Sequence, residues 1–370
     1  MNKILITGAK GFIGKNLIQS LTEQTKAQLL FYDIGNSEEE LKEYLKEADF
    51  IFHLAGINRP VKEEDFKKGN SLFTEKIIDI LEENHKKTPI LITSSIQAEI
   101  NNPYGISKKE AEEALLKYHE KTGAKIFIYR LPNVFGKWSR PNYNSAVATF
   151  CYNISHDVEV WVSDKEKELT LTYIDDVVEA FLQSLEKTLD LPTVYYTISK
   201  TYTVTLGDLV DKIQSFRAIR SSSVIPNLSE ELTRYLYTTY LSYIDTKNLS
   251  YSAIKKEDNR GYFSELLKSK EFGQISISTT HPGIVRGNHY HHTKVEKFIV
   301  VKGKGLIKLR KVEEDKVNEF EVNGDFPEIV DIAPGYTHSI ENIGSEELIT
   351  LFWVNEIFNQ DKPDTFYKEV

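Results

Sequence analysis

The segment ILITGAKGFIG, residues 4–14, sets the architecture of the first half of the chain. Its apolar residues are typical of a short strand, and glycines follow at every third position before a segment with helical spacing. In such a turn the first glycine allows a tight bend, the second lets a pyrophosphate approach the backbone, and the third lets the helix pack closely against the strand. The phosphates would lie at the helix N-terminus, where backbone N–H groups lack intrahelical partners. The sequence therefore predicts dinucleotide binding by Gly8, Lys10, Gly11, Phe12, Ile13 and Gly14.

Outward from this turn, short apolar segments alternate with charged helical segments up to about residue 245. Apolar runs without period-two alternation predict buried strands at Ile4–Thr7, Gln28–Tyr32, Phe50–Leu54, Ile90–Ser94 and Ile126–Leu131. Helical spacing predicts helices at Gly14–Gln24, Ser37–Glu47, Ser71–Glu83 and Tyr104–Lys121. This alternation indicates right-handed βαβ units, and therefore an α/β fold with a doubly wound parallel sheet of the Rossmann type.

The second part of the chain has a different pattern of predicted secondary structure. Strand-like segments dominate, separated by Gly, Pro, Asn and Asp, and no helical pattern of useful length interrupts them. We expect strands at Gln274–Thr280, Phe298–Lys302, Gly305–Lys311, Asn318–Val322, Glu328–Ile332 and Glu347–Val354. Such a run predicts an all-β barrel or sandwich. The expected boundary lies near Asp245–Lys255, which divides the chain into domains 1–245 and 246–370.

The composition excludes several classes of protein. The chain has 370 residues, 40% hydrophobic and 27% charged, which is typical of a globular protein with real cores. Lys and Arg number 46 against 55 Asp and Glu, so the net charge is −9 and a nucleic-acid partner is not expected. Cys151 is the single cysteine, so no internal disulfide can form, which favours a reducing compartment. No apolar run approaches the roughly 18 residues that span a bilayer. We therefore expect a cytoplasmic protein without membrane insertion.

A tyrosine and a lysine open one of the predicted helices. Tyr104 and Lys108 are four residues apart, which places them on one helical face. An ammonium beside a phenol favours the phenolate, so we expect Lys108 to lower the pKa of Tyr104. Such a tyrosine can exchange a proton with a carbonyl oxygen while a hydride moves. The preceding strand ends in Ser94-Ser95, and its hydroxyl groups could hydrogen-bond the same oxygen.

The residues leave the choice between NAD and NADP open. Asp33 ends the second predicted strand, where an acidic side chain usually accepts a hydrogen bond from the ribose 2′-hydroxyl and favours NAD. Lys10 lies inside the glycine turn, where its ammonium can neutralise the 2′-phosphate of NADP. These two signals point in opposite directions.

Together these motifs resemble the extended, nucleotide-sugar branch of the short-chain dehydrogenase/reductase superfamily over residues 1–245. Further matches are HLAG at 53–56, RLPNVFG at 130–136 and TYIDDV at 172–177. The resemblance implies that Ser95, Tyr104 and Lys108 form a catalytic triad. It further implies cofactor contacts from Asp33, Leu54, Ala55, Gly56, Thr93, Tyr104, Lys108 and Leu131, and sugar-nucleotide contacts from Asn133, Lys137 and Arg140.

A histidine cluster marks the second part of the chain. His289 and His291 are two apart, so on one strand they would face the same side, and Glu296 and His338 would come from neighbouring strands. Three imidazoles and a carboxylate suit Zn²⁺, Mn²⁺, Fe²⁺ or Ni²⁺. The spacing resembles the two signature motifs of the cupins, which implies a cupin barrel. The stretch DNRGYFSE at 258–265 also resembles the deoxysugar 3,5-epimerases of that superfamily, which work without a metal.

A reductase domain fused to a cupin resembles the bifunctional enzymes of capsular polysaccharide precursor synthesis. This resemblance implies a UDP-4-keto-hexosamine substrate, with epimerisation at C3 by the cupin and reduction of the C4 ketone with NADPH. The product would be UDP-N-acetyl-L-talosamine, on the route to UDP-N-acetyl-L-fucosamine. Zinc and a homodimer are implied as well. The alternatives are a C4 reductase with a structural, metal-bound cupin for dimerisation, and a cofactor sensor without enzymatic activity, against which Tyr104 and Lys108 argue.

Overall fold

The computed structural model describes residues 3–60, 62–186 and 194–370. These residues divide into two compact units, which we describe separately. The first unit extends to Ile213 and also includes Tyr235–Ile244. The second unit consists of Gln214–Arg234 and Asp245–Val370. The last change of unit along the chain therefore falls between Ile244 and Asp245, while the short segment Gln214–Arg234 belongs with the later residues.

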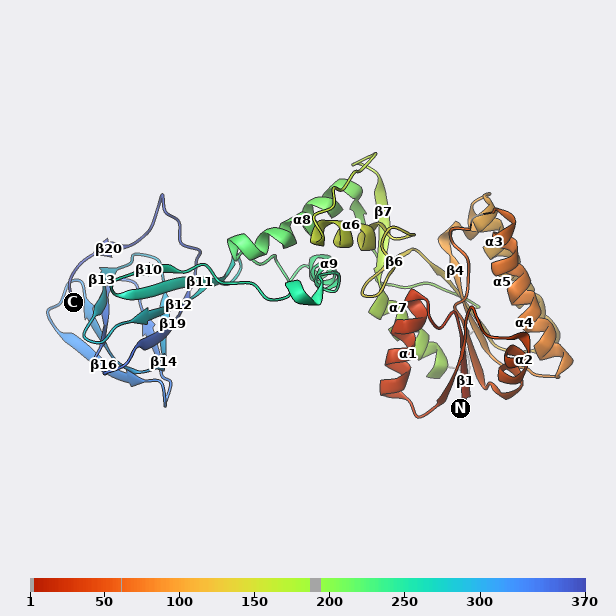
Figure 1. Cartoon of the computed structure of the whole chain (residues 1–370), viewed down its shortest axis with the longest axis horizontal. Coiled ribbons are helices and arrows are strands. Elements are labelled where there is room, and N and C mark those ends of the chain that lie inside the picture. The colour runs from red at the N-terminus through yellow and green to blue at the C-terminus, as the bar shows by residue number, and fades with distance from the viewer. Residues whose placement is uncertain (1–2, 61, 187–193) are drawn as a thin grey trace. The chain divides into compact units, whose positions relative to one another are not determined.

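A six-stranded parallel sheet forms the centre of the first unit (Figure 1). Its strands are β1 (Lys3–Thr7), β2 (Gln28–Tyr32), β3 (Phe50–His53), β4 (Ile90–Ser95), β5 (Ile126–Leu131) and β8 (Tyr195–Tyr196). They lie in the order β2-β1-β3-β4-β5-β8, so the chain places β2 on one side of β1 and then crosses to the other side with β3. Open α/β sheets bind ligands beyond the carboxyl ends of the strands at such a reversal.

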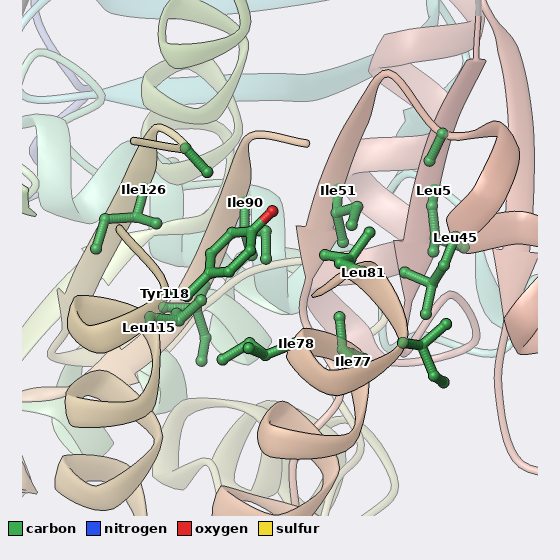
Figure 2. Packing of buried hydrophobic residues seen from close by; sticks show 14 of the residues in the cluster. Leu5, Leu45, Ile51, Ile77, Ile78, Leu81, Ile90, Leu115, Tyr118 and Ile126 are labelled. Atoms are coloured by element: carbon green, nitrogen blue, oxygen red, sulfur yellow. The ribbon is translucent and has the colours of Figure 1, made fainter. Parts of the chain in front are cut away.

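Helices cover both faces of this sheet (Figure 1). One face carries α1 (Phe12–Gln24) and α7 (Ile174–Glu186), and the other carries α2 (Glu38–Glu47), α3 (Glu64–Gly69), α4 (Ser71–Glu83) and α5 (Pro103–Thr122). Figure 2 shows how leucines from three of these helices pack against the strands, with Leu45 beside Leu5, Leu81 beside Ile51 and Leu115 beside Ile126. Each such side chain contributes about 1.5–3 kcal/mol when it leaves water. The buried face explains why these strands have continuous apolar sequences.

A smaller sheet and further helices complete the first half of the chain. The sheet has the order β6-β7-β9, with β6 (Asn133–Phe135), β7 (Glu168–Tyr173) and β9 (Tyr202–Thr205). The helices are α6 (Ala146–Ser155), α8 (Leu206–Ser222) and α9 (Glu231–Leu241). Because β6 follows β5 almost directly, the segment that begins at Asn133 starts beside the carboxyl edge of the main sheet.

The second unit is an antiparallel β sandwich. One sheet has the order β10-β11-β12-β19-β14-β17 and the other the order β16-β15-β18-β13-β20. The strands are β10 (Lys256–Asp258), β11 (Gly261–Ser269), β12 (Gly273–Thr280), β13 (Val285–Tyr290), β14 (Glu296–Lys302), β15 (Lys304–Lys311), β16 (Val317–Asn323), β17 (Ile329–Ile332), β18 (Tyr336–Asn342), β19 (Leu348–Val354) and β20 (Phe366–Tyr367). Its core joins the two sheets, with Phe298 and Val300 from one and Ile307 and Ile340 from the other.

The predicted fold classes are confirmed. All of the predicted strands and helices appear, with bounds that differ by at most two residues. In the second unit five strands were not predicted, because their short or mixed polar sequences lack a clear period: β10, β11, β13, β18 and β20. β13 carries a bulge between Gly287 and His289, with Asn288 at a φ of 57°, so its sequence VRGNHY does not alternate regularly.

Two candidate active sites

The glycine turn lies at the carboxyl end of β1. Gly8 has a φ of +70°, and a Cβ there would lie 2.7 Å from the backbone nitrogen of Ala55. A Cβ on Gly14 would lie 2.3 Å from the carbonyl oxygen of Gly8. Both positions therefore require glycine. Helix α1 has no side-chain cap and no acidic residue in its first turn, so its first N–H groups can receive an anion such as a pyrophosphate.

A cavity of about 660 Å³ opens at this edge of the sheet. Most residues predicted to bind cofactor or substrate line it: Gly8, Lys10, Gly11, Phe12, Ile13, Gly14, Leu54, Gly56, Thr93, Ser95, Tyr104, Lys108, Leu131, Asn133 and Arg140. Three predicted residues are not among its lining residues: Asp33, Ala55 and Lys137. The structure thus brings the glycine turn, the tyrosine–lysine pair and most of the predicted substrate contacts to one cavity.

Two of the three outlying side chains are held elsewhere. Asp33 accepts the backbone N–H of Lys10 at 2.6 Å and that of Ile34 at 2.7 Å, so its carboxylate lies against the glycine turn. Lys137 donates to Asp175 at 2.9 Å. Lys10, in contrast, lines the cavity. Of the two residues with opposite cofactor preferences, Lys10, which favours NADP, therefore lies at the cavity.

Helix α5 positions the tyrosine and the lysine. Asn102 caps the helix by accepting the N–H of Gly105 at 2.8 Å, which places Tyr104 in the first turn. The Nζ of Lys108 lies 6.0 Å from the centre of the Tyr104 ring and donates to the carbonyl of Thr93 at 3.0 Å. Thr93 lies on β4, whose last residue is Ser95. The predicted triad therefore comes from one helix start and one strand end.

Burial governs the ionisation of this pair. Burial raises the pKa of Tyr104, and hydrogen bonding to Ser95 acts in the opposite direction. Burial lowers the pKa of Lys108 to about 8, although the charge of Glu112 raises it. Burial has the larger effect, so the pKa of Tyr104 is raised and the lowering expected from Lys108 is not seen in this structure. Tyr104 is a phenol at neutral pH, which is the form that can donate a proton.

Sequence reasoning missed Glu112, one turn beyond Lys108 on α5. Its side chain is only 1% exposed, accepts a hydrogen bond from the Ser94 hydroxyl, and binds Arg130 of β5 through Nε at 3.0 Å and Nη2 at 2.6 Å. This carboxylate ties the helix that carries Tyr104 and Lys108 to the strand that ends in Ser95. Its four-residue spacing from Lys108 was the available signal, because it places a second charge on the same helical face.

The cavity also has polar and aromatic lining residues that the sequence did not single out. They are Asn58, Gln97, Trp138, Ser139, Tyr143, Asn144 and Ser145. Trp138 has a φ of 70°, and the guanidinium of Arg140 lies 5.2 Å from the centre of the Tyr143 ring. The last five of these residues, from Trp138 to Ser145, follow β6 in a loop without hydrophobic periodicity, so no pattern marked them in advance.

The four predicted metal ligands meet in the second unit. The ligand atoms of His289, His291, Glu296 and His338 all lie within 4.8 Å of one another. His289 on β13 is paired with His338 on β18, and His291 follows β13 directly. Glu296 begins β14, which belongs to the opposite sheet. The expectation of neighbouring strands therefore holds for the histidines only, and the carboxylate reaches the cluster across the sandwich.

The atoms at the centre of this cluster lack hydrogen bonds. Glu296 Oε2 lies 3.4 Å from His291 Nε2 and 3.2 Å from His338 Nε2, yet none of these three buried atoms has a hydrogen-bond partner in the described part of the chain. Buried polar atoms without partners are costly, and nitrogen and oxygen donors that converge in this way fit a divalent transition metal. The chemistry of the donor set therefore suits the predicted ion.

The protonation states agree with this interpretation. Burial lowers the pKa of His289 to about 4, so its imidazole is neutral at pH 7 and can act as a ligand. Burial would raise the pKa of the Glu296 carboxyl, but His291 and His338 hold it well below its usual range. Burial lowers the pKa of His291 while Glu296 raises it, and the net direction is upward. A raised pKa means that His291 holds a proton more readily beside Glu296. A metal cation between the two side chains would replace this proton.

A second cavity, of about 430 Å³, adjoins the cluster. It is lined by His289, His291 and Glu296 and by four basic side chains, Lys256, Arg260, Arg286 and Lys294. The Nε and Nη2 atoms of Arg286 are buried and have no hydrogen-bond partner in the described ranges, and Nη2 lies 3.9 Å from Asp258. Guanidinium donors that make no hydrogen bond within the described residues suit an anionic ligand in the adjoining cavity.

Comparison with known proteins agrees with both halves of this architecture. Residues 4–196 match the NAD dependent epimerase/dehydratase family, and residues 256–366 match the polysaccharide biosynthesis C-terminal domain. The chain belongs to the NAD dependent epimerase/dehydratase family, whose cofactor is of the NAD(P) class. It is a homologue of CapF. The structure of the capsular polysaccharide assembling protein CapF from Staphylococcus aureus superimposes with a TM-score of 0.93 at 46% identity, and each chain is covered in full.

Two further relatives extend this result. The UDP-2-acetamido-2,6-beta-L-arabino-hexul-4-ose reductase of Pseudomonas aeruginosa is 44% identical over 364 residues, which is 98% of either chain. A structure of CapF with the inhibitor 3-isopropenyl-tropolone has a TM-score of 0.89 at 42% identity over the full length of both chains. Among the described residues, no helix combines the length and the apolar character that crossing a membrane would require.

Proposed function

We propose that the protein is an NADPH-dependent UDP-4-keto-sugar reductase of capsular polysaccharide synthesis and that its second unit epimerises C3 of the same substrate. The product would be UDP-N-acetyl-L-talosamine, on the route to UDP-N-acetyl-L-fucosamine. The observation that carries the reductase is the single cavity shared by the glycine turn, Ser95, Tyr104 and Lys108. The relative from Pseudomonas, named as a 4-ketosugar reductase, supports the substrate class.

The residues of the first cavity have distinct tasks in this reduction. The nicotinamide supplies the hydride to C4 when it is bound. Ser95 holds the C4 carbonyl oxygen, and Tyr104 donates its phenolic proton to that oxygen as negative charge develops on it. Lys108, held by the Thr93 carbonyl, stabilises the phenolate that remains. Asn133, Arg140 and the aromatic residues beyond β6 are placed to bind the sugar nucleotide.

NADPH is favoured over NADH by the position of Lys10. Its side chain belongs to the cavity wall, whereas the acidic Asp33 accepts backbone N–H groups of the turn and lies outside the wall. A 2′-phosphate would therefore meet an ammonium.

The second cavity suits proton abstraction next to a ketone. The C4 carbonyl acidifies the proton on C3, so a basic group would remove it, and return of a proton to the opposite face would complete the epimerisation. A divalent cation such as Zn²⁺ would stabilise the negative charge on the carbonyl oxygen in between. His289, His291, Glu296 and His338 would hold the ion, and Arg260 and Arg286 would bind the diphosphate. A tropolone has a hydroxyl beside a carbonyl, a pair of oxygens that chelates divalent cations, so the inhibitor named for a CapF structure supports a metal in this family.

Solvent-deuterium incorporation tests the epimerase directly. The full chain, incubated with the UDP-4-keto sugar in D₂O without NADPH, should exchange the C3 proton, as followed by NMR. Tyr104→Phe should keep this exchange while it loses reduction. If the wild-type chain reduces the ketone but exchanges no C3 proton, the second unit is a structural module and the protein is a reductase only. The homodimer and the cytoplasmic location implied by the sequence stay predictions.

A further inference from the structure

The last residues of the chain lie along the strands that hold the histidines. We call Pro363–Val370 the C-terminal strap. Its strand β20 pairs with β13, with Tyr367 opposite His289. The N–H of Lys368 donates to the carbonyl of Asn288 at 2.9 Å, and Thr337 donates to the carbonyl of Lys368. The strap therefore contacts the immediate chain neighbours of His289 and His338, which lie 31 to 82 positions away in the sequence.

Asp364 holds the loop between two of the proposed ligands. One carboxylate oxygen accepts the N–H of His292 at 3.0 Å. The other accepts the N–H groups of Thr293 at 2.9 Å and Lys294 at 3.0 Å, together with the Thr293 hydroxyl at 2.9 Å. This loop joins His291 to Glu296, so one side chain sets the separation of a histidine and a carboxylate that must meet at one ion.

The backbone of Asp364 fixes the histidine itself. Its carbonyl oxygen lies 2.5 Å from Nδ1 of His291. A carbonyl can only accept a hydrogen bond, so Nδ1 must carry the proton. In the neutral imidazole, Nε2 then carries a lone pair and no proton. This nitrogen lies 3.4 Å from Glu296 Oε2. Two facing acceptors in a buried site need a positive charge between them, and a metal ion bound to Nε2 would supply it. A hydrogen bond at the other ring nitrogen orients metal-binding histidines in general.

From this geometry we infer that Asp364 is a positioning residue of the metal site: its carboxylate anchors the strap to the 292–294 loop, and its carbonyl locks His291 in the metal-binding tautomer. The C-terminal strap is then part of the metal centre although it supplies no ligand. This inference rests on the metal site proposed above. Asp364 has a φ of 38°, which Asp and Asn adopt more readily than most residues, so Asn is the conservative replacement.

Zinc affinity of the metal-free full chain tests the inference. The protein is stripped with a chelator, and Zn²⁺ is titrated in competition with a chromophoric chelator. We expect Asp364→Ala to weaken Zn²⁺ binding by about 10–100-fold, the usual effect of removing an outer-shell partner. Asp364→Asn, which keeps one acceptor oxygen and tolerates the backbone conformation, should weaken it less. Asp361→Ala removes an exposed carboxylate from the same terminal region and should leave the affinity unchanged.

Two further measurements separate positioning from a general loss of structure. The stripped Asp364→Asn chain should melt close to the stripped wild type, because the anchor is partly kept, while its Co²⁺-substituted form should show altered d–d absorption bands. NMR of the wild type should show His291 protonated at Nδ1. Wild-type affinity in both Asp364 variants, or a His291 protonated at Nε2, would overturn the inference. A wild-type chain that binds no Zn²⁺ would instead remove the metal site itself.

Discussion

The reductase site and the histidine site are assembled in different ways. In the first, each side chain follows a strand of one parallel sheet, and the carboxyl ends of these strands meet at one edge by topology. In the second, the ligands come from two sheets, and Asp364 of the C-terminal strap, which orients His291, lies 73 positions further along the chain. A site at the common edge of one parallel sheet still forms when a strand is a residue longer or shorter. A site between two sheets depends on the register of the strands in both sheets. We therefore expect the two sites to fail independently and for different reasons.

The largest effect should come from Tyr104→Phe. Loss of the phenolic proton donor should lower the rate of ketone reduction by about 10²- to 10⁴-fold, the usual contribution of a general acid. The fold, NADPH binding and metal content should stay unchanged, since the ring is preserved. Stopped-flow oxidation of NADPH measures the rate. Reduction at the wild-type rate would show that another group delivers the proton.

The next effect concerns His338→Ala in the second unit. The variant should lose its metal by elemental analysis, and at metal concentrations near 100 times Kd the lost binding alone should destabilise this unit by about 2.7 kcal/mol. C3 exchange should fall, while reduction of an already epimerised ketone persists. His281→Ala, which alters an exposed histidine that faces Glu347, is the matched control. Full exchange in a metal-free His338→Ala chain would make the metal structural.

Glu112→Gln should shift the pH dependence of the reductase. Burial lowers the pKa of Lys108 to about 8 and Glu112 raises it, while His53 and Tyr104 are the other titratable groups beside it. Activity that needs the ammonium is present at low pH and falls as the pH rises through this pKa. Without Glu112 the pKa is lower, so the alkaline limb of kcat/KM should move to lower pH.

The same substitution should destabilise the first unit by about 2 kcal/mol, because a charged hydrogen-bond network is weakened. Glu113→Gln, on the exposed side of α5, controls for a change of net charge. An alkaline limb at the same pH in Glu112→Gln and wild type would show that Lys108 does not set it.

The smallest effect is expected for Lys10→Ala. An exposed ammonium beside a 2′-phosphate should contribute on the order of a tenfold difference in Kd, about 1.4 kcal/mol. The affinity for NADPH should fall by this factor and the affinity for NADH should hardly change, as measured by fluorescence titration. Lys26→Ala, an exposed lysine beyond the end of α1, is the control. Equal losses of affinity for both cofactors would show that Lys10 does not recognise the 2′-phosphate and that Asp33 determines the cofactor preference.

Much of both sites could be predicted because their motifs are local. Gly8, Gly11 and Gly14 lie within one turn, and Tyr104 and Lys108 within one helical turn, so their spacing already implies their geometry. Glu112 could not be recognised in the same way, because its partners Ser94 and Arg130 lie on two different strands.

The sequence by itself determined the two fold classes, the glycine turn and the identity of the four converging residues. The fold classes follow from periodicity, the glycine turn from short spacing, and the four residues from two motifs that resemble those of the cupins. Only the tertiary structure decided the ionisation of the site, because the pKa of Tyr104 depends on how far folding removes water from it. It also decided that Asp33 turns to the backbone, that Glu296 reaches the histidines from the opposite sheet, and that Asp364 supports them. These contacts join segments distant in the chain, and no local pattern records a contact that only packing creates.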